Sequence, residues 1–500
     1  MSIAQLLLAC EKEGLAPEYR TGSTTPVAFN AGNAEVFVVS DFHTGAGVDS
    51  SGVYSGTENF FADGSFARFL KNAHHSLNGK PGLLVINGDF IDFLRIVNVP
   101  RGLDFQRWQD MLASVGIAMD KDALVASISK KEKENYGLKT HDFKSVWKLD
   151  VCAHGHPALF AALAEWLKLG HNLVIVKGNH DLEWYWLAVR NYLRLTLAKF
   201  INEQTGEGVE SILKSDVLPR LTFIDDAMIV DNELYIEHGH RYDKFSNVQG
   251  GPLWGSKELN IPFGSFINRY LLNNLEMIYP FLDNVRPSGN VLHMLMRERF
   301  FHGLKVLFKY IPFTFKMIPK RYAHYMLKPL VGYALAIGLP IVLVLFLWGN
   351  RLWPLLFPES STGPQNVGDV ALGFLIGILK ETALLFLSYL GARFISWVQL
   401  EEPSSLFRDA EKLFSKFPHC RFFTMGHTHN PEQHQTDQWY VNSSTWIPVI
   451  EASSAALRED RTYAVVQFGR ESNGLLKSSP LQRWNDDANR LEPLPIVVRD

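Results

Sequence analysis

The chain has 500 residues, a formal charge of −3 and 47% hydrophobic residues, so it is long enough for one large core or for two or three domains. No strongly basic balance marks a nucleic-acid binder, and nucleic acid is not an expected partner. Three cysteines stand far apart at positions 10, 152 and 420, which excludes a disulfide framework. The first residues have no basic region before their short apolar run, which favours a surface or docking helix over a signal peptide.

Two predicted strands open the chain, and each ends in polar residues. Residues 35–41 (EVFVVSD) are apolar until Asp41, and His43 follows. Residues 83–92 (LLVINGDFID) form a second run that ends in Gly88 and Asp89, with Asp92 three positions later. Short apolar runs of this length, bounded by glycine and polar residues, are typical of buried strands.

A predicted helix then leads into a third strand. Residues 156–170 carry apolar side chains at helical spacing and end at a glycine. The apolar run 173–176 follows at once and ends in Gly178-Asn179-His180-Asp181. A helix that crosses over between two buried strands predicts a parallel sheet and an α/β fold.

Further strands are predicted at 221–225, 227–231 and 233–240, with a turn at Asp231-Asn232 and with His238 at the end of the last one. Residues 421–431 (RFFTMGHTHNP) form another strand that ends in His427 and His429, and two more follow at 438–446 and 461–469. The predicted core therefore comprises residues 1–248 and 401–475, with a peripheral tail at 476–500.

Residues 249–400 differ in character and are predicted to be a mainly helical, hydrophobic insertion. Lysine, arginine and aromatic residues dominate residues 297–328, residues 330–348 carry no charge, and residues 370–398 are apolar but interrupted by Lys380, Glu381 and Arg393. The charge-free run is long enough to cross a bilayer. Three interpretations stay open: a membrane-spanning pair, a hairpin lying in the membrane interface, and a buried helix of a soluble domain.

The charge pattern around the insertion extends the membrane hypothesis. Lysine and arginine crowd the flank nearest the predicted core, whereas the loop 349–369 has only Arg351. The positive-inside rule then predicts membrane association with the core on the cytoplasmic side, and the basic stretch favours anionic lipid.

Seven candidate metal ligands follow the ends of five predicted strands. Carboxylate, imidazole and amide oxygen together suit Mn, Fe or Zn, and one bridging carboxylate, for which Asp89 is the natural choice, could hold two divalent ions. Each cluster alone could equally be a polar turn, and His154-Gly155-His156, which precedes a helix, is set aside on that ground. The ligands are Asp41, His43, Asp89, Asn179, His238, His427 and His429.

The motifs DFH, GDFID, GNHD, HGHRYD and GHTH occur here in the order in which the calcineurin-like metallophosphoesterase superfamily has them. Over about residues 33–245 and 415–470 the chain resembles that superfamily, and GDFID and HGHRYD resemble its UDP-2,3-diacylglucosamine diphosphatase branch. The resemblance implies a two-sheet β-sandwich flanked by helices, with a binuclear metal centre. It also implies hydrolysis of a phosphoester or phosphoanhydride by a hydroxide that bridges the two ions.

The resemblance also assigns roles to individual residues. One ion would be held by Asp41, His43, Asp89 and His429, and the other by Asp89, Asn179, His238 and His427. His180 would act near the leaving group, oriented by Asp181. Arg241, Tyr242 and Asp243 follow a candidate ligand closely in the sequence, which makes them candidates to contact the substrate or to support a ligand, and the alternative that they are ordinary surface residues stays equally open.

Two departures weaken the narrower resemblance, since the branch often has GNRD where this chain has GNHD, and it lacks so long an insertion. The expected partner is a phosphorylated, membrane-associated and lipid-linked substrate, and no protein partner is deducible. Two alternatives stay open: a membrane-anchored phosphatase or phosphodiesterase for soluble nucleotides or phosphoproteins, and a non-catalytic scaffold.

Overall fold

The computed structural model describes residues 2–11, 25–255, 257–276, 309–322, 405–451, 456–458, 461–479 and 481–494, with a few isolated positions between 277 and 403. The chain divides into two compact units, Met1–Met317 with Glu402–Asp500, and Ile318–Glu401. The division falls after residue 317, whereas the predicted insertion begins at 249. All elements that bear the candidate site belong to the first unit.

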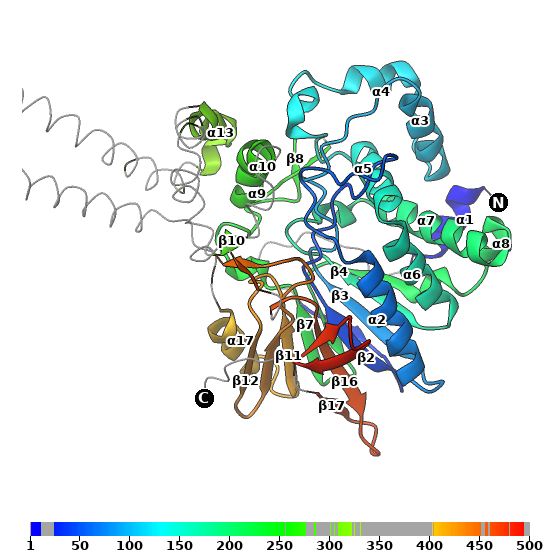
Figure 1. Cartoon of the computed structure of the whole chain (residues 1–500), viewed down its shortest axis with the longest axis vertical. Coiled ribbons are helices and arrows are strands. Elements are labelled where there is room, and N and C mark those ends of the chain that lie inside the picture. The colour runs from blue at the N-terminus through cyan, green and yellow to red at the C-terminus, as the bar shows by residue number, and fades with distance from the viewer. Residues whose placement is uncertain are drawn as a thin grey trace, which may run out of the picture. The chain divides into compact units, whose positions relative to one another are not determined.

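The larger sheet has eight strands and is parallel at its centre (Figure 1). Its parallel strands are β2 (Glu35–Val39), β3 (Gly82–Asn87), β4 (Asn172–Val176) and β5 (Leu221–Ile224). Strand β16 (Ala464–Arg470) pairs antiparallel with β2 and carries β17 (Leu476–Ser478), β18 (Gln482–Asn485) and β19 (Arg490–Pro493) at this side. All six residues of β3 are buried, as expected for a central strand covered on both faces.

The smaller sheet has six strands in the order β1-β6-β7-β11-β13-β12. They are β1 (Val27–Phe29), β6 (Ala227–Val230), β7 (Leu234–Glu237), β11 (Phe422–Met425), β12 (Glu432–Gln435) and β13 (Trp439–Asn442). Strands β7, β11 and β13 are parallel, so their carboxyl ends meet at one edge. Shorter pairs are β8 (Leu253–Trp254) with β9 (Glu258–Leu259), and β10 (Val285–Arg286) with β14 (Ile450–Glu451) and β15 (Ala456–Leu457).

Three apolar cores hold these layers together. Val38 and Val85 of the larger sheet share one core with Met228 and Ile236 of the smaller sheet, so the two sheets pack face to face. The opposite face of the larger sheet is covered by α2 (Asp63–Ser76), α5 (Asp142–Gly155), α6 (Pro157–Lys168) and α7 (Leu187–Thr205) (Figure 1). Helix α17 (Phe407–Phe414) covers the smaller sheet. The other α-helices among the described residues are α1 (Ile3–Ala9), α3 (Asp104–Ser114), α4 (Lys121–Ser127), α8 (Val209–Lys214), α9 (Phe263–Ile267), α10 (Asn273–Glu276) and α13 (Ile311–Met317).

The structure confirms the predicted α/β class and the positions of the predicted strands. Helix α6 and strand β4 confirm the helix-to-strand crossover at 156–176. Asp231 and Asn232 have φ of 49° and 63° and connect the antiparallel pair β6 and β7, as the turn signal predicts. The predicted peripheral tail is wrong for its described part, because β17, β18 and β19 extend the larger sheet and bury Leu476, Leu481 and Trp484.

The predictions of a transmembrane helix and of membrane localisation are corrected. Among the described residues, no helix combines the length and the apolar character that a bilayer crossing requires. The runs 330–348 and 370–398, on which those predictions depended, lie outside the described residues except for Val331. Membrane association is therefore not carried further, and the predicted helical character of the insertion falls largely outside the described part of the chain.

Candidate metal centre

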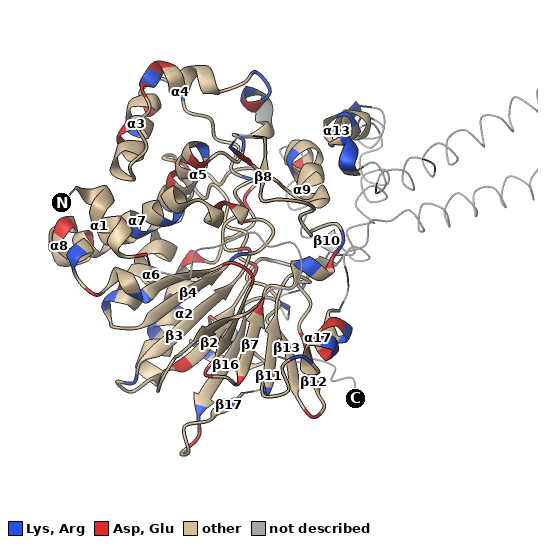
Figure 2. Ribbon diagram, turned by 180° about the vertical axis from the view of Figure 1, so that it is seen from behind, with Lys and Arg blue, Asp and Glu red and all other residues tan. Residues whose placement is uncertain are grey.

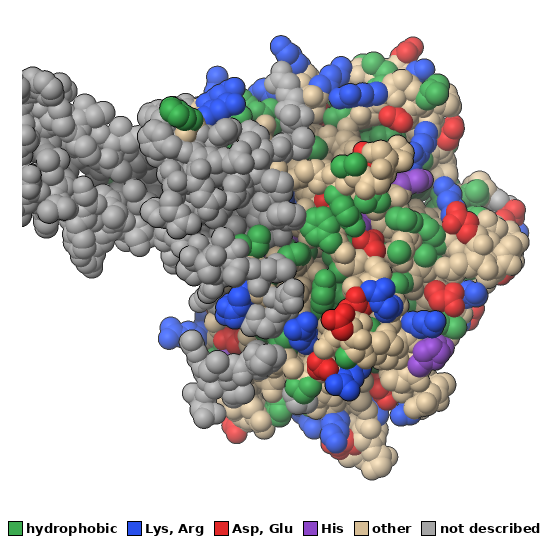
Figure 3. All heavy atoms as spheres, viewed as in Figure 1, with side chains coloured by type: hydrophobic (Ala, Val, Ile, Leu, Met, Phe, Trp, Pro, Cys, Tyr) green, Lys and Arg blue, Asp and Glu red, His purple; other side chains and the backbone are tan. Residues whose placement is uncertain are grey.

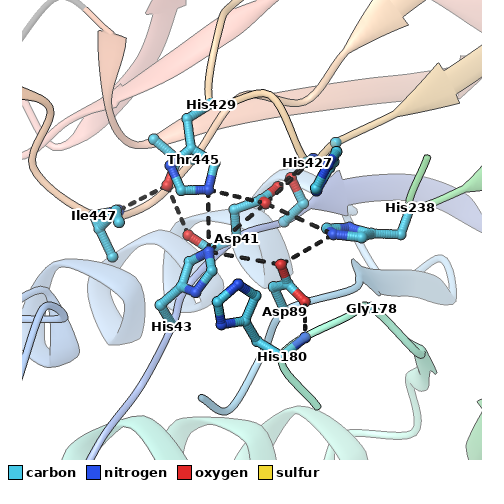
Figure 4. A network of polar contacts seen from close by, with 12 residues as sticks. Asp41, His43, Asp89, Gly178, His180, His238, His427, His429, Thr445 and Ile447 are labelled. Atoms are coloured by element: carbon cyan, nitrogen blue, oxygen red, sulfur yellow. Dashed lines mark hydrogen bonds and ion pairs between the residues drawn. The ribbon is translucent and has the colours of Figure 1, made fainter. Parts of the chain in front are cut away.

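The candidate ligands follow five strands whose carboxyl ends meet at one edge of the sandwich. Asp41 and His43 follow β2, Asp89 follows β3, and Asn179 follows β4. The other ligands come from the smaller sheet, where His238 follows β7 and His427 and His429 follow β11. In the view from behind, strands of both sheets end side by side beneath the same loops (Figure 2). The fold thus gathers side chains that are up to 388 positions apart in the sequence (Figure 4).

Asp41, His43 and His429 form one group that could hold a cation. The Nε2 atoms of His43 and His429 lie 3.0 Å apart, and Nε2 of His429 lies 3.2 Å from Oδ1 of Asp41. Two nitrogens that each lie about 2.1 Å from one ion are separated by about 3.0 Å when they subtend a right angle. The spacing of these side chains therefore fits a shared ion.

Asp89, His238 and His427 form a second such group. Nε2 of His238 lies 3.0 Å from Oδ2 of Asp89 and 4.0 Å from Oδ1 of Asp41. Oδ2 of Asp89 also lies 3.7 Å from Nε2 of His43, in the first group. Asp89 therefore stands between the two groups, which is the place that a bridging carboxylate must occupy (Figure 4).

Three motif glycines make room for a ligand from another motif. A Cβ on Gly88 would lie 2.3 Å from Nδ1 of His238, and one on Gly178 would lie 2.1 Å from Oδ1 of Asp89. A Cβ on Gly426 would lie 2.6 Å from Oδ2 of Asp41. The glycines that precede Asp89, Asn179 and His427 are therefore required by the close approach of neighbouring segments.

The backbone around the site is strained. Five candidate ligands have φ between 47° and 71°, a region that non-glycine residues seldom adopt and that costs on the order of 1–3 kcal/mol for each residue. Hydrogen bonds from neighbouring loops hold these conformations; for example, Thr445 Oγ1 donates to the carbonyl oxygen of Asp41 at 2.7 Å. Such strain is common at functional sites. The five residues are Asp41, His43, Asp89, His427 and His429.

Two ligand atoms are poised for a cation. Nδ1 of His238 lies 2.8 Å from the carbonyl oxygen of Asn87 and donates to it, which leaves the Nε2 lone pair facing Asp89 when the ring is neutral. Within the described part of the chain nothing donates a hydrogen bond to Oδ1 of Asn179, although this atom is buried. A buried acceptor without a donor is costly, and a cation would satisfy it.

The carboxylates and imidazoles of the site shift one another's pKa values. Burial alone would raise the pKa of Asp89, but His238, His180 and His43 outweigh it and hold that pKa well below its usual value. Burial would lower the pKa of His238, but Asp89 and Asp41 raise it to about 9. Without an ion the cluster thus holds a proton on His238, and binding of a cation would displace that proton.

His180 is oriented by Asp92, which corrects the predicted role of Asp181. Nδ1 of His180 lies 2.7 Å from Oδ2 of Asp92. Asp181 instead accepts hydrogen bonds from the backbone N–H groups of Phe90 (2.9 Å) and Gly178 (2.6 Å), so it joins the two loops. Burial, and after it Asp89, raises the pKa of Asp181 to about 6. Asp92 was not among the predicted site residues, although its position three residues after Asp89 is a signal that could have identified it.

The three predicted substrate residues have different surroundings. Oδ2 of Asp243 lies 3.4 Å from Nε2 of His427, so Asp243 supports a candidate ligand. Arg241 pairs with Glu237, and the Tyr242 hydroxyl donates to Glu237 at 2.7 Å. Glu237 precedes His238 on the extended chain, so its side chain points to the opposite face. The structure does not bring Arg241 and Tyr242 to the cluster.

The site histidines are buried, which distinguishes them from ordinary surface histidines. His43 is 2% exposed and His238 is 1% exposed, and only a few histidine side chains (purple) reach the face in Figure 3. A buried set of imidazoles and carboxylates of this kind could hold metal ions. Comparison with protein-family models, curated proteins and solved structures finds no match.

Proposed function

We propose that this protein is a metal-dependent hydrolase that cleaves a phosphoester or phosphoanhydride bond, and that its fold is a two-sheet metallophosphoesterase sandwich. The observation that carries the proposal is the place of Asp89 between two buried groups of candidate ligands, one with His43 and one with His238. The order of the five motifs along the chain supports it. The proposed ions are two divalent cations, Mn, Fe or Zn, which match the mixed oxygen and nitrogen donors.

Asp41, His43, Asp89 and His429 would hold one ion, and Asp89, Asn179, His238 and His427 would hold the other. Bound there, the ions would supply an activated water and would neutralise charge on the phosphoryl oxygens. His238 would bind through Nε2, because its Nδ1 already donates a hydrogen bond to the carbonyl oxygen of Asn87. His43 would also bind through Nε2, which is the atom that faces His429.

His180 is the proposed proton donor to the leaving group. Its side chain is 11% exposed, whereas that of Asp92 is fully buried. Asp92 fixes the orientation of the ring through Nδ1. A histidine held in this way donates a proton efficiently near neutral pH. No residue of the chain needs to form a covalent bond to the substrate, because the attacking group is water.

The test is hydrolysis by purified full-length protein loaded with Mn²⁺. The panel consists of an aryl phosphate monoester, an aryl phosphate diester, a nucleoside diphosphate sugar and a lipid-linked diphosphate dispersed in detergent. We expect turnover of at least one class that needs the added metal and that Asp89→Asn abolishes. Turnover that persists undiminished in Asp89→Asn would contradict the proposal, and binding of metal without turnover of any class would favour a scaffold.

A further inference from the structure

A second buried cluster of charged side chains lies behind the candidate metal centre. Glu58 and His156 are 2% and 0% exposed, and Nε2 of His156 lies 3.1 Å from Oε2 of Glu58. Nδ1 of the same ring lies 3.0 Å from Oδ1 of Asp63, at the start of α2. Both ring nitrogens therefore face carboxylates, which describes a protonated imidazole rather than a metal ligand.

Glu58 binds the loop that follows His43. Its two oxygens accept hydrogen bonds from the N–H of Gly45 (3.1 Å) and the N–H of Gly47 (2.6 Å). Oε1 also accepts from Asn59 N–H at 3.0 Å and Phe60 N–H at 2.8 Å, which holds the carboxylate itself in place. One buried carboxylate thus fixes Gly45 and Gly47, the first of which lies two residues after the candidate ligand His43.

The end of helix α5 also contacts the loop that follows His43. The N–H of Val48 donates to the carbonyl oxygen of Gly155 at 3.1 Å. A Cβ on Gly47 would lie 2.3 Å from that oxygen, and a Cβ on Gly155 would lie 1.9 Å from the carbonyl oxygen of Ala46. The two backbones touch directly, and His156 is the next residue along the chain.

We propose that Glu58, held by His156, is a positioning residue for the cation site of Asp41, His43 and His429. His43 has φ of 47°, a conformation that would relax if the following residues were released. The bonds from Glu58 to Gly45 and Gly47 prevent that relaxation and keep the His43 ring directed at His429. The role rests on the proposed function only in requiring that the site binds a divalent cation.

The same clamp connects two ligand-bearing segments. His156 immediately precedes α6, and α6 leads into β4 and so to Asn179 and His180. Glu58 therefore joins the loop after β2 to the start of the crossover that ends in the loop after β4. Residues that orient metal ligands from outside typically change the affinity for the metal 10- to 100-fold when they are lost.

The test compares Glu58→Gln with Glu132→Gln in the full-length, metal-free protein titrated with Mn²⁺ by calorimetry. Glu132 is a matched control, because it is equally buried, accepts N–H bonds from Ser129 and Lys139, and pairs with Lys144 at 2.6 Å. Its loop carries none of the candidate ligands. Both variants are expected to lower the midpoint of thermal unfolding, and only Glu58→Gln is expected to weaken binding of one Mn²⁺ at least tenfold.

Equal Mn²⁺ affinity in wild type and Glu58→Gln would overturn this inference and leave the proposed function intact, whereas a wild-type protein that binds no Mn²⁺, Zn²⁺ or Fe²⁺ would overturn both. If Glu58→Gln shows no cooperative unfolding transition, Gly45→Ala decides in its place. Its added Cβ would lie 2.9 Å from Oε2 of Glu58 and would displace the carboxylate without removing its charge. For Gly45→Ala, too, we expect binding of one Mn²⁺ to weaken at least tenfold, and an affinity equal to that of wild type would overturn the inference.

Discussion

The sequence His-Gly-His occurs twice, at 154–156 and at 238–240, and the two copies have opposite chemistry. His238 follows a strand, donates from Nδ1 to a backbone carbonyl and turns Nε2 towards Asp89. His156 follows a helix and places both ring nitrogens against carboxylates. The first imidazole is arranged to bind a cation, whereas the second is itself the cation of a buried ion pair.

The difference lies in the groups around each ring and not in the local sequence. A carbonyl oxygen that accepts from one ring nitrogen fixes the tautomer of the neutral imidazole, so the other nitrogen presents its lone pair. Two carboxylates beside the two nitrogens of one ring favour the protonated imidazole. Residues 154–156, set aside as metal ligands on their sequence context, instead place His156 against Glu58 behind the site. Variants of the two copies should therefore have different effects.

The largest effect is expected from Asp89→Asn, which removes the carboxylate that lies between the two groups and that we propose bridges the two ions. An amide has one oxygen instead of two and carries no charge, so it cannot serve both ions. We expect Mn²⁺-dependent hydrolysis to fall on the order of 1000-fold, the scale of several kcal/mol that metal ions contribute to such reactions. Initial rates with the best substrate of the panel, at saturating Mn²⁺, measure it.

His238→Ala and His156→Ala contrast the two copies directly. Loss of His238 should remove one bound ion, which the stoichiometry of a Mn²⁺ titration reports. Loss of His156 acts only through Glu58, so the number of ions should stay the same while the affinity falls about tenfold. Loss of an ion in both variants, or in neither, would show that the two copies do not differ as described.

The pH dependence of stability should follow His156. Burial opposes its charge, but Asp63 and Glu58 raise the pKa of His156 to about 9, from about 6.5 in an unfolded chain. Its contribution, on the order of 3 kcal/mol, is fully present below pH 6.5, declines as pH rises further and is lost above about 9. Burial raises the pKa of the neighbouring Cys152 thiol well above its usual value, so ionisation of this thiol in the unfolded chain adds a second decline in stability above about pH 8.5.

Urea unfolding between pH 6 and 10 measures this dependence, with saturating Mn²⁺ so that His238 stays deprotonated. His156→Gln should remove the part of the decline that begins near pH 6.5, below the range in which the unfolded thiol ionises. A profile in wild type that is already flat would refute the charged state assigned to His156.

The smallest effect is expected at Asp243, which supports His427 from a distance of 3.4 Å. Asp243→Asn keeps the shape of the side chain and removes its charge, so Mn²⁺ affinity should fall about tenfold without a change in stoichiometry. Arg241→Met provides a comparison, since Arg241 pairs with Glu237 away from the cluster and its loss should leave Mn²⁺ affinity unchanged. Calorimetric titration of both variants would separate them.

Local patterns were sufficient to predict the strands and the residues that follow them. Apolar runs such as 82–87 can be read without tertiary information because both faces of a central strand are buried. The sequence could not show that Asp92 rather than Asp181 holds His180, because that depends on where two loops turn after their strands. Glu58 could not be identified for the same reason, since its partner His156 lies 98 residues away in sequence.

The tail and the membrane predictions failed for another reason. Residues 482–493 alternate only weakly between apolar and polar side chains and end in Pro493, so their strands form only because the edge of β16 is available for pairing. The membrane prediction used the apolar character of residues 330–398 and the charges that flank them, and among the described residues no helix could span a bilayer.

The most direct test of the central claim is anomalous diffraction from crystals of the full-length protein grown with Mn²⁺. We predict two anomalous peaks on either side of Asp89, one contacted by His43 and His429 and the other by His238 and His427, with none near His156. Peaks elsewhere, or an ordered site with Asp89 bound to no metal, would contradict the account.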